Sequence, residues 1–247
     1  MAYLDNAATT AMLPEALEVM YREAANVGNA SSLHGAGRRA RRVVEESREK
    51  LAAAVGAKPQ EIIFTASGTE ANNLAVKGLF WNAGATKRAI LSSPIEHHAI
   101  LDPLEWLERE HNVTLHLADV DSNGRTKVES VAQLLSEHQN EISFVTVMHS
   151  NNEVGALQPV EEIAAISREY KIPIHTDAVQ SFGKVDLNYQ ELGLFGMTLS
   201  AHKIGGPLGI GVLILRRAVE IPALLHGGGQ EREIRSGTLN APAIVAF

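Results

Sequence analysis

The chain has 247 residues, 45% of them hydrophobic and 21% charged, which is typical of a globular protein with room for one large α/β domain. A formal net charge of −7 argues against nucleic acid or an anionic membrane as a partner, and no stretch approaches the ~20 apolar residues that span a bilayer. The absence of cysteine excludes disulfides, thiolate metal sites and a cysteine nucleophile from these residues. The start, MAYLDNAATT, lacks the pattern of a signal peptide, so we expect a cytoplasmic protein.

The first thirty residues are expected to pack against the main domain. Residues 3–13 read as an extended segment with turns. Pro14 suits the first turn of a helix to about Asn26, because the N–H that proline lacks would be unpaired there. Residues 27–37 are rich in glycine, asparagine and serine and predict a loop.

A second helix is predicted over residues 37–55, with four arginines near its start. These arginines could form an anion site. The i,i+4 spacing of Arg41 with Glu45 and of Arg42 with Glu46 favours ion pairs on a solvated face instead.

From residue 61 onward, buried strands alternate with helices. Strands are predicted at residues 61–66, 87–93, 113–119, 142–149, 172–177, 194–200 and 209–216, and helices at 68–84, 98–111, 128–137 and 160–171. This alternation predicts βαβ units and a mostly parallel sheet flanked by helices, in one domain over residues 1–247.

The stretch MTLSAHKIGGPLGIG, residues 197–211, places Lys203 between an apolar strand and a glycine-rich loop. Glycines let the backbone approach a bulky group. A lysine held and desolvated beside such a loop has more of its amine neutral, as a nucleophile toward an aldehyde requires. Taken alone, Lys203 is better explained as an ordinary loop cation.

The stretch IPIHTDAVQ, residues 172–180, delivers Asp177 at the end of an apolar strand, followed by Gln180. An aspartate there can simply cap the next helix. Together with Lys203, however, it matches pyridoxal phosphate (PLP), whose aldehyde needs a lysine and whose pyridine nitrogen needs a carboxylate. Asp177 and Lys203 are therefore the primary site candidates.

Polar groups follow three further predicted strands. The residues Gly68 and Thr69 open a helix whose free N–H groups can bind a phosphate, although an ordinary N-cap explains them equally well. His97 can stack on a flat ring or bond the backbone at a helix start, and no H-E-x-x-H or comparable spacing predicts a metal. Asn152 offers an amide to a ring hydroxyl, and no G-x-S-x-G elbow supports a hydrolase. Because ligands of open α/β sheets sit at the carboxyl ends of strands, these groups together predict one PLP pocket.

The sequence resembles the cysteine desulfurases, a branch of the class-V aminotransferase group with the type I PLP fold. The matching stretches are YLDNAATT, SSLHGAGRRAR, FTASGTEANN, EHHAIL, MHSNNEVGALQPV, HTDAVQSFGK, SAHKIGGPLGIG and GGGQEREIRSGTLN. They run from residue 3 to residue 240, so the resemblance covers nearly the whole chain. It implies the PLP-binding large domain of that fold.

The resemblance also implies a role for each matching residue. Lys203 would bind the cofactor aldehyde covalently and later move the α-proton of the substrate, L-cysteine. Asp177 would pair with the pyridinium nitrogen and His97 would stack on the ring. The remaining cofactor contacts would be Asn152 and Gln180 at the phenolic oxygen, Gly68, Thr69, Ser200 and His202 at the phosphate, and Thr238 at the phosphate of the partner subunit. A homodimer with shared active sites is therefore expected, with sulfur-acceptor or scaffold proteins as possible partners.

One departure from the family is important. Family members continue into a smaller C-terminal domain with a catalytic cysteine on a mobile loop, whereas this chain stops at Phe247 and contains no cysteine. We therefore expect a fragment, one part of a split enzyme, or a chain without desulfurase activity. Two alternative functions stay open: another class-V enzyme, such as a selenocysteine lyase or carbon–sulfur lyase, and a noncatalytic scaffold.

Overall fold

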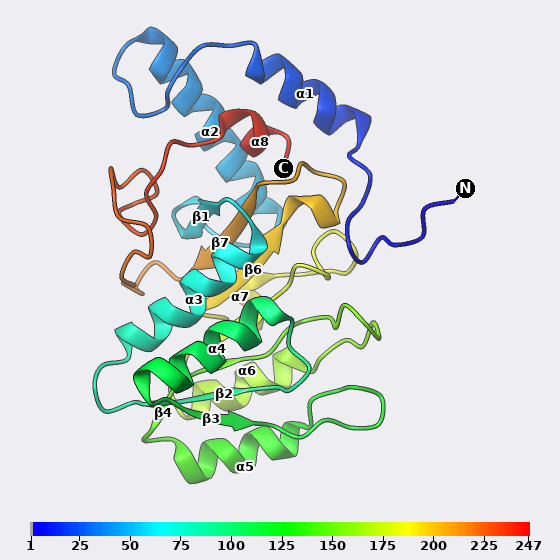
Figure 1. Cartoon of the computed structure of the whole chain (residues 1–247), viewed down its shortest axis with the longest axis vertical. Helices are drawn as coiled ribbons and strands as arrows, with labels where there is room; N and C mark the ends of the chain where they lie inside the picture. The colour runs from blue at the N-terminus through cyan, green and yellow to red at the C-terminus, as the bar shows by residue number, and fades with distance from the viewer. Residues whose placement is uncertain (1) are drawn as a thin grey trace.

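The computed structural model describes residues 2–247, and Met1, part of the predicted N-terminal segment, lies outside the described residues. In this part of the chain seven strands form one sheet with helices on both sides (Figure 1). The strands are β1 (Ile62–Thr65), β2 (Ala89–Ser92), β3 (Thr114–Leu117), β4 (Ile142–Thr146), β5 (Ile174–Asp177), β6 (Gly196–Ser200) and β7 (Gly211–Leu215). The helices are α1 (Pro14–Ala24), α2 (Gly35–Ala54), α3 (Gly68–Asn82), α4 (His98–His111), α5 (Val128–His138), α6 (Val160–Glu169), α7 (Tyr189–Leu192) and α8 (Ala241–Val245), with 3-10 turns at Pro59–Glu61 and Ala201–Lys203. Every predicted strand and helix is present, while α7, α8 and the 3-10 turns go beyond the prediction.

The sheet is mostly parallel, as predicted. Its order is β1-β7-β6-β5-β4-β2-β3, and the pairs β2–β3, β2–β4, β4–β5 and β5–β6 are parallel. Strand β7 runs antiparallel to both β1 and β6. Because only β7 is reversed, β1 points the same way as the parallel strands. The carboxyl ends of six strands therefore meet at one edge of the sheet.

Both faces of the sheet are buried except along the partly exposed edge strand β3. On β1, Ile62 and Phe64 belong to one apolar cluster, whereas Ile63 between them belongs to the other. Successive side chains of a strand point to opposite faces, so a strand covered on both sides has to be apolar throughout. Helices α3 and α4 cover one face, seen at the front of Figure 1, and α2, α5 and α6 supply side chains to the core of the other.

The N-terminal segment reaches the end of β6 through backbone hydrogen bonds. The N–H of Thr10 donates to the carbonyl of His202 at 3.0 Å, and the N–H of Leu13 donates to the carbonyl of Gly205 at 2.8 Å. Gly205 has a φ of +83°, and a Cβ there would lie 2.7 Å from Leu13 Cγ, so both the turn and the close approach require glycine. This segment therefore lies over the lysine loop, and α1 behind it packs on α8.

The arginines of α2 are only partly on a solvated face. Arg42 pairs with Glu46 at 3.7 Å as predicted, but Arg41 donates to the Ala30 carbonyl at 2.9 Å instead of pairing with Glu45. The prediction for Arg41 was wrong because the loop before α2 folds back along the helix and offers a closer acceptor.

Further along α2, Arg48 is buried and forms a bidentate ion pair with Glu231, with N–O distances of 2.7 and 2.9 Å. It also donates to the carbonyl of Ile62 at 2.7 Å, and Glu231 accepts the N–H of Phe64 at 2.8 Å. This buried network joins α2, β1 and the segment before α8.

Among the described residues, no helix combines the length and apolarity needed to cross a membrane.

Candidate functional site

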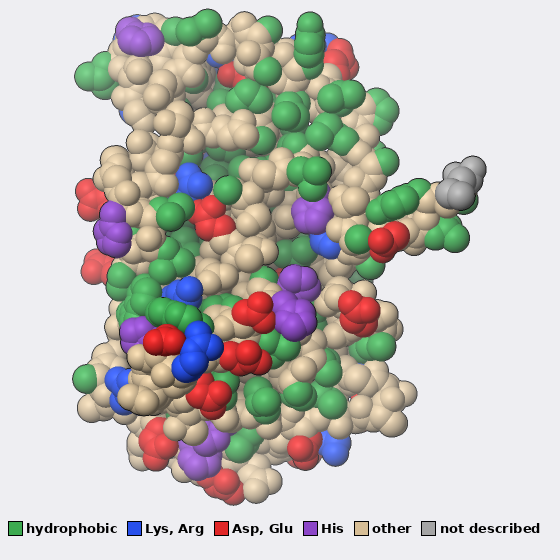
Figure 2. Space-filling model, viewed as in Figure 1, with side chains coloured by type: hydrophobic (Ala, Val, Ile, Leu, Met, Phe, Trp, Pro, Cys, Tyr) green, Lys and Arg blue, Asp and Glu red, His purple; other side chains and the backbone are tan. Residues whose placement is uncertain are grey.

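A cavity of about 300 Å³ lies at the edge of the sheet where the carboxyl ends of the strands meet. Figure 2 shows the corresponding hollow in the middle of the molecule, with histidine side chains on either side of it. Nine predicted site residues line the cavity: Gly68, Thr69, His97, Asn152, Asp177, Gln180, Ser200, His202 and Lys203. They follow five different strands and converge because six strands end at this edge.

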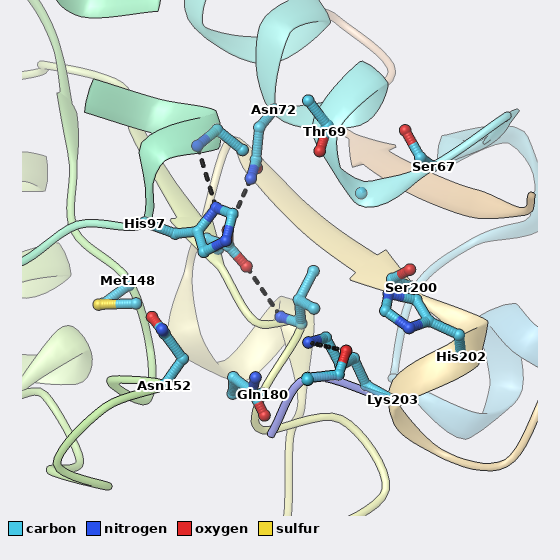
Figure 3. Close-up of a pocket in the computed structure, with 15 residues that line it drawn as sticks. Ser67, Thr69, Asn72, His97, Met148, Asn152, Gln180, Ser200, His202 and Lys203 are labelled. Atoms are coloured by element: carbon cyan, nitrogen blue, oxygen red, sulfur yellow. Dashed lines mark hydrogen bonds between the residues drawn. The ribbon is translucent and has the colours of Figure 1, made fainter. Parts of the chain in front are cut away.

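Lys203 enters the cavity from the 3-10 turn after β6 (Figure 3). Its Nζ donates to the carbonyls of Ala7 and Ala8, the latter at 2.8 Å. Burial lowers the pKa of the Lys203 amine, the nearby charge of Lys184 lowers it further, and the carboxylates of Asp177 and Asp5 oppose the shift. The amine is therefore anchored, and its neutral form is easier to reach than that of a fully exposed lysine.

Asp177 is the last residue of β5 and only 6% exposed. Its Oδ1 accepts the N–H of Val179 at 2.9 Å, and its Oδ2 accepts Nδ2 of Asn72 at 2.6 Å. Burial raises the pKa of the Asp177 carboxyl, whereas these two donors and the electrostatic influence of the nearby His97 and Lys203 side chains lower it. A cationic group in the cavity would further favour the carboxylate.

The start of α3 forms another wall of the cavity. Ser67 caps the helix, its hydroxyl accepting the N–H of Glu70 at 3.0 Å. A Cβ at Gly68 would lie 3.1 Å from Val179 Cγ2 and 3.4 Å from Ser200 Cβ, so glycine keeps this corner open. With the hydroxyls of Thr69 and Ser200 nearby, the corner offers an anion the helix N–H groups and dipole.

His202 stands beside this corner. Its ring Nδ1 lies 3.2 Å from the hydroxyl of Thr9. Burial lowers the pKa of the imidazole, and the charge of Lys203 lowers it further, so the neutral ring is favoured. The neutral ring can still donate one hydrogen bond to an anion.

His97 has both roles considered from the sequence. As the N-cap of α4, its Nδ1 accepts the N–H of Ala99 at 3.0 Å, which leaves the proton of the neutral ring on Nε2. The same ring lines the cavity, beside Asn72 in Figure 3. The hydrogen bond to the backbone fixes the ring in place as one wall of the cavity.

The three remaining predicted residues differ in position. Asn152 and Gln180 line the cavity, but their amides bond elsewhere, to Glu153 at 2.8 Å and to the Ala7 carbonyl at 2.9 Å. Thr238 is exposed and is not among the residues that line the cavity of its own chain.

Three polar residues at or beside this site are absent from the predicted set: the helix cap Ser67, Asn72 and Glu96. Asn72 lines the cavity and holds Asp177, while its own Oδ1 is buried without a hydrogen-bond partner among the described residues. Glu96 is buried beside His97 and accepts the N–H of Met148 through Oε1 at 2.6 Å. Asn72 lies one helical turn after Thr69 on the face turned to the cavity, a signal that could have revealed it; Glu96 offers no comparable signal.

Comparison with known sequences covers the whole described chain. The profile of the family described as Aminotransferase class-V matches residues 2–247. An "IscS-like cysteine desulfurase" of Mycobacterium tuberculosis (strain ATCC 25618 / H37Rv) is 44% identical over 250 residues, covering 100% of this chain and 63% of the relative. A "Cysteine desulfurase IscS" of Dictyoglomus turgidum (strain DSM 6724 / Z-1310) is 41% identical over 248 residues, covering 99% and 61%. The chain thus spans about three fifths of the length of these two relatives.

Solved structures agree with this relationship. One described as "NIFS-LIKE PROTEIN" superposes with a TM-score of 0.95 at 38% identity, covering 99% of this chain and 67% of that one. Another, "SspA in complex with cysteine", also has a TM-score of 0.95, at 35% identity, and covers 100% and 71%. These neighbours confirm the predicted α/β fold. From the family match over residues 2–247 and these similarities in sequence and structure, we conclude that the chain belongs to the aminotransferase class-V family.

Proposed function

We propose that this chain is the cofactor-binding part of a PLP-dependent cysteine desulfurase, which converts L-cysteine to L-alanine and passes the sulfur to an enzyme thiol. The observation that carries the proposal is the meeting of Lys203, buried Asp177 and the start of α3 in one cavity. Relatives named cysteine desulfurase, at 41% and 44% identity, and a solved relative in complex with cysteine support this choice of substrate.

The residues of the cavity fit PLP. The open corner at Gly68, with the Ser200 and Thr69 hydroxyls and His202, suits its phosphate. Asp177 suits the pyridine nitrogen, and the unpartnered Oδ1 of Asn72 offers a buried acceptor beside it. When bound, PLP supplies an electron sink for charge that develops on the substrate.

The ring would be held by the remaining predicted residues. His97 would stack on it, and Asn152 and Gln180 would turn their amides from Glu153 and Ala7 toward its phenolic oxygen. Asn72 would hold Asp177 in place as the negative partner of the ring nitrogen.

Lys203 would have two roles. Its amine, with a pKa lowered by burial, would bind the cofactor aldehyde and then carry a proton to and from Cα of the substrate. The Ala7 and Ala8 carbonyls would hold the amine between these events, since they already accept hydrogen bonds from Nζ.

The thiol, the partners and the location are further parts of the proposal. None of the 247 residues is a cysteine, so the sulfur-accepting thiol would come from outside this sequence. Thr238 would serve a second copy of the chain, because it is exposed and stands apart from the cavity of its own chain. The homodimer, a sulfur-acceptor protein and a cytoplasmic location all stay predictions.

The first experiment tests the lysine. Protein loaded with PLP and reduced with borohydride should carry the label on Lys203, and Lys203→Ala should carry none. Lys50→Ala, which removes an exposed lysine of α2, is the control and should label like the wild type. Label on a different lysine would overturn the assignment.

The second experiment tests the substrate. In deuterated water, the loaded chain should exchange the α-proton of L-cysteine, and Asp177→Asn should slow that exchange. Alanine should accumulate only when a protein thiol is supplied. Sustained alanine formation by this chain alone, dependent on Lys203, would indicate a simple lyase, and preference for selenocysteine would indicate a selenocysteine lyase. PLP binding without any exchange would indicate a scaffold.

A further inference from the structure

Two histidines and a glutamate meet at the edge of the sheet, away from the PLP-type cavity. His116 lies on edge strand β3, His138 is the last residue of α5, and Glu141 immediately precedes β4. Their ligand atoms all lie within 4.8 Å of one another. None of the three residues lines the cavity that holds Lys203. We propose that His116, His138 and Glu141 form a binding site for a divalent transition-metal ion, with Zn²⁺ as the best fit.

The set of donor atoms points to this class of metal. Imidazole nitrogens bind zinc and similar ions, and a carboxylate completes a common three-residue zinc set with a fourth position open to water. Magnesium and calcium, by contrast, prefer oxygen ligands. Glu137 offers a second carboxylate, with Oε2 3.8 Å from His138 Nε2, which can orient the ring while Nδ1, on the side of Glu141, binds the ion.

An unpaired atom is the second observation. His116 Nε2 is buried and has no hydrogen-bond partner among the described residues. A desolvated nitrogen without a hydrogen-bond partner destabilises the folded protein. A metal ion bound at this nitrogen would supply the missing partner.

The two rings lie close enough for a small movement to complete the site. Their centroids are 4.1 Å apart, the planes meet at 22°, and His138 Nδ1 lies 4.0 Å from Glu141 Oε2. A tetrahedral zinc, with Zn–N distances of about 2.0–2.1 Å, holds its ligand atoms about 3.3 Å apart. His138 and Glu141 flank the short turn between α5 and β4, where rotation of their side chains can bring their donor atoms toward His116.

The location also favours a cation. His138 ends α5, where the carbonyl groups and the helix dipole present partial negative charge. Figure 2 shows histidine and acidic side chains together at the lower end of the molecule, where α5 lies in Figure 1. A bound ion would join the end of α5 to the outermost strand of the sheet. The sequence shows no metal motif because His116 and His138 belong to separate elements.

The test uses the 247-residue chain, freed of metal with a chelator and of any PLP. Zinc binding is measured by competition with a chromogenic zinc chelator, and thermal unfolding is followed with and without zinc. We expect one zinc whose affinity falls at least tenfold in His116→Ala and in His138→Ala, with a zinc-dependent rise in Tm that both variants lose. His226→Ala, which removes an exposed histidine elsewhere, is the control and should keep both properties.

Two further measurements distinguish loss of the zinc site from loss of the fold. Glu141→Gln keeps the size of the side chain, so weaker zinc binding in this variant cannot come from misfolding. The X-ray absorption spectrum of the zinc-loaded wild type should show two imidazole ligands. Unchanged affinity in all three variants, an equal rise in Tm with magnesium, or a spectrum without imidazole would overturn the proposal.

Discussion

Asn72 holds the carboxyl of Asp177, the residue opposite the lysine. Its Nδ2 donates to Asp177 Oδ2 at 2.6 Å, and this bond lowers the pKa of a carboxyl whose pKa burial raises. The proposed cofactor requires Asp177 as a carboxylate, so loss of the Asn72 side chain should weaken PLP binding.

The first prediction concerns Asn72→Ala. Removing the donor raises the pKa of Asp177 further and weakens its pairing with the pyridinium. Hydrogen bonds to charged groups contribute about 1.5–3 kcal/mol, so PLP affinity should fall roughly ten- to a hundredfold. Fluorescence titration with PLP measures this, with Asn73→Ala, the next residue of α3, as the control. Equal affinities for the two variants would contradict the role.

The second prediction concerns Glu96. Burial, and then the charge of Asp177, raise the pKa of its carboxyl well above the ordinary value of 4.5, although the N–H of Met148 opposes this. The folded protein thus holds a proton that the unfolded chain releases above about pH 4.5, so Glu96 lowers stability as the pH rises toward its folded pKa. At pH 8, Glu96→Gln should have a higher Tm than the wild type. Near pH 4, the Tm values of the two proteins should be equal.

The control for this comparison is Glu105→Gln, an exposed position on α4. It should follow the wild type across the whole pH range. A difference between Glu96→Gln and the wild type that does not change with pH would show that Glu96 is charged in the folded state.

At the scale of single residues, the sequence predicted the side chains at strand ends that face the cavity. It did not predict the residues that hold these side chains or the neighbouring backbone in place. Lys203 and Asp177 were predictable because a glycine loop and an apolar strand lie next to them in the chain. Asn72 and Glu96 act through partners in other parts of the fold, Asp177 at the end of β5 and Met148 just after β4. Such contacts depend on strand order, which the periodicity of a single chain does not give.

Among the elements, the start of α3 has a natural counterpart in the start of α2. Gly68 and Gly35 are both the first residue of a helix after a capping side chain. A Cβ at Gly68 would meet Val179 and Ser200, whereas a Cβ at Gly35 would have nothing within 4 Å. Alanine at the two positions should change helix propensity in a similar way, but only alanine at position 68 should also change ligand binding.

The third prediction compares Gly68→Ala with Gly35→Ala. The new methyl group at position 68 occupies the corner proposed for phosphate, so PLP and inorganic phosphate should bind about tenfold or more weakly, a loss of ~1.4 kcal/mol. Gly35→Ala should leave binding unchanged and stabilise α2 by up to ~1 kcal/mol. Isothermal titration and thermal unfolding measure the two effects, and undiminished phosphate binding in Gly68→Ala would place the anion elsewhere.

The fourth prediction concerns the ion pair between α2 and the segment before α8. Arg48→Met leaves the buried Glu231 carboxylate without its partner, so the free energy of unfolding should fall by about 3–5 kcal/mol. Adding Glu231→Gln removes the isolated charge and keeps an oxygen for the Phe64 N–H. Urea unfolding should therefore show the double variant to be more stable than Arg48→Met alone; the reverse order would mean that Glu231 tolerates the loss of Arg48.

For whole elements, sequence reasoning succeeded where periodicity decides and failed where tertiary contacts decide. The strands inside the sheet could be predicted as largely apolar runs because both of their faces are buried, and α4 begins at His98 and ends at His111 as predicted. The ion pair of Arg48 was not predicted because the arginines of this helix were assigned to a solvated face. Its partner Glu231 also lies far along the chain. The short helices α7 and α8 have too few residues for a periodic pattern to identify.

At the scale of the molecule, the cavity depends on contacts between distant parts of the chain. Thr65, at the end of β1, pairs with Gly211, at the start of β7, and the turn with Lys203 lies just before β7. Pairings between distant segments form slowly, because closing the long loop between them costs entropy before any contact forms.

The fifth prediction follows from this pairing. During refolding from urea in the presence of PLP, the far-UV circular dichroism signal should recover before the absorption of lysine-bound PLP. Repeating the experiment at higher PLP concentration is the control, since a step limited by folding keeps its rate. Simultaneous recovery of both signals would show that β1 and β7 pair early.

The position of β1 at the edge of the sheet beside β7 also matters during translation. The ribosome releases Ile62, Ile63 and Phe64 long before the residues of β7 exist, although all three end up buried. The nascent chain therefore carries an apolar strand that must wait for its neighbour, a state that exposes it to aggregation or to chaperones. Strands β2 to β6 can assemble meanwhile. The cavity proposed for PLP is lined in part by Ser200, His202 and Lys203, so a chain whose synthesis has not reached these residues would lack the proposed site.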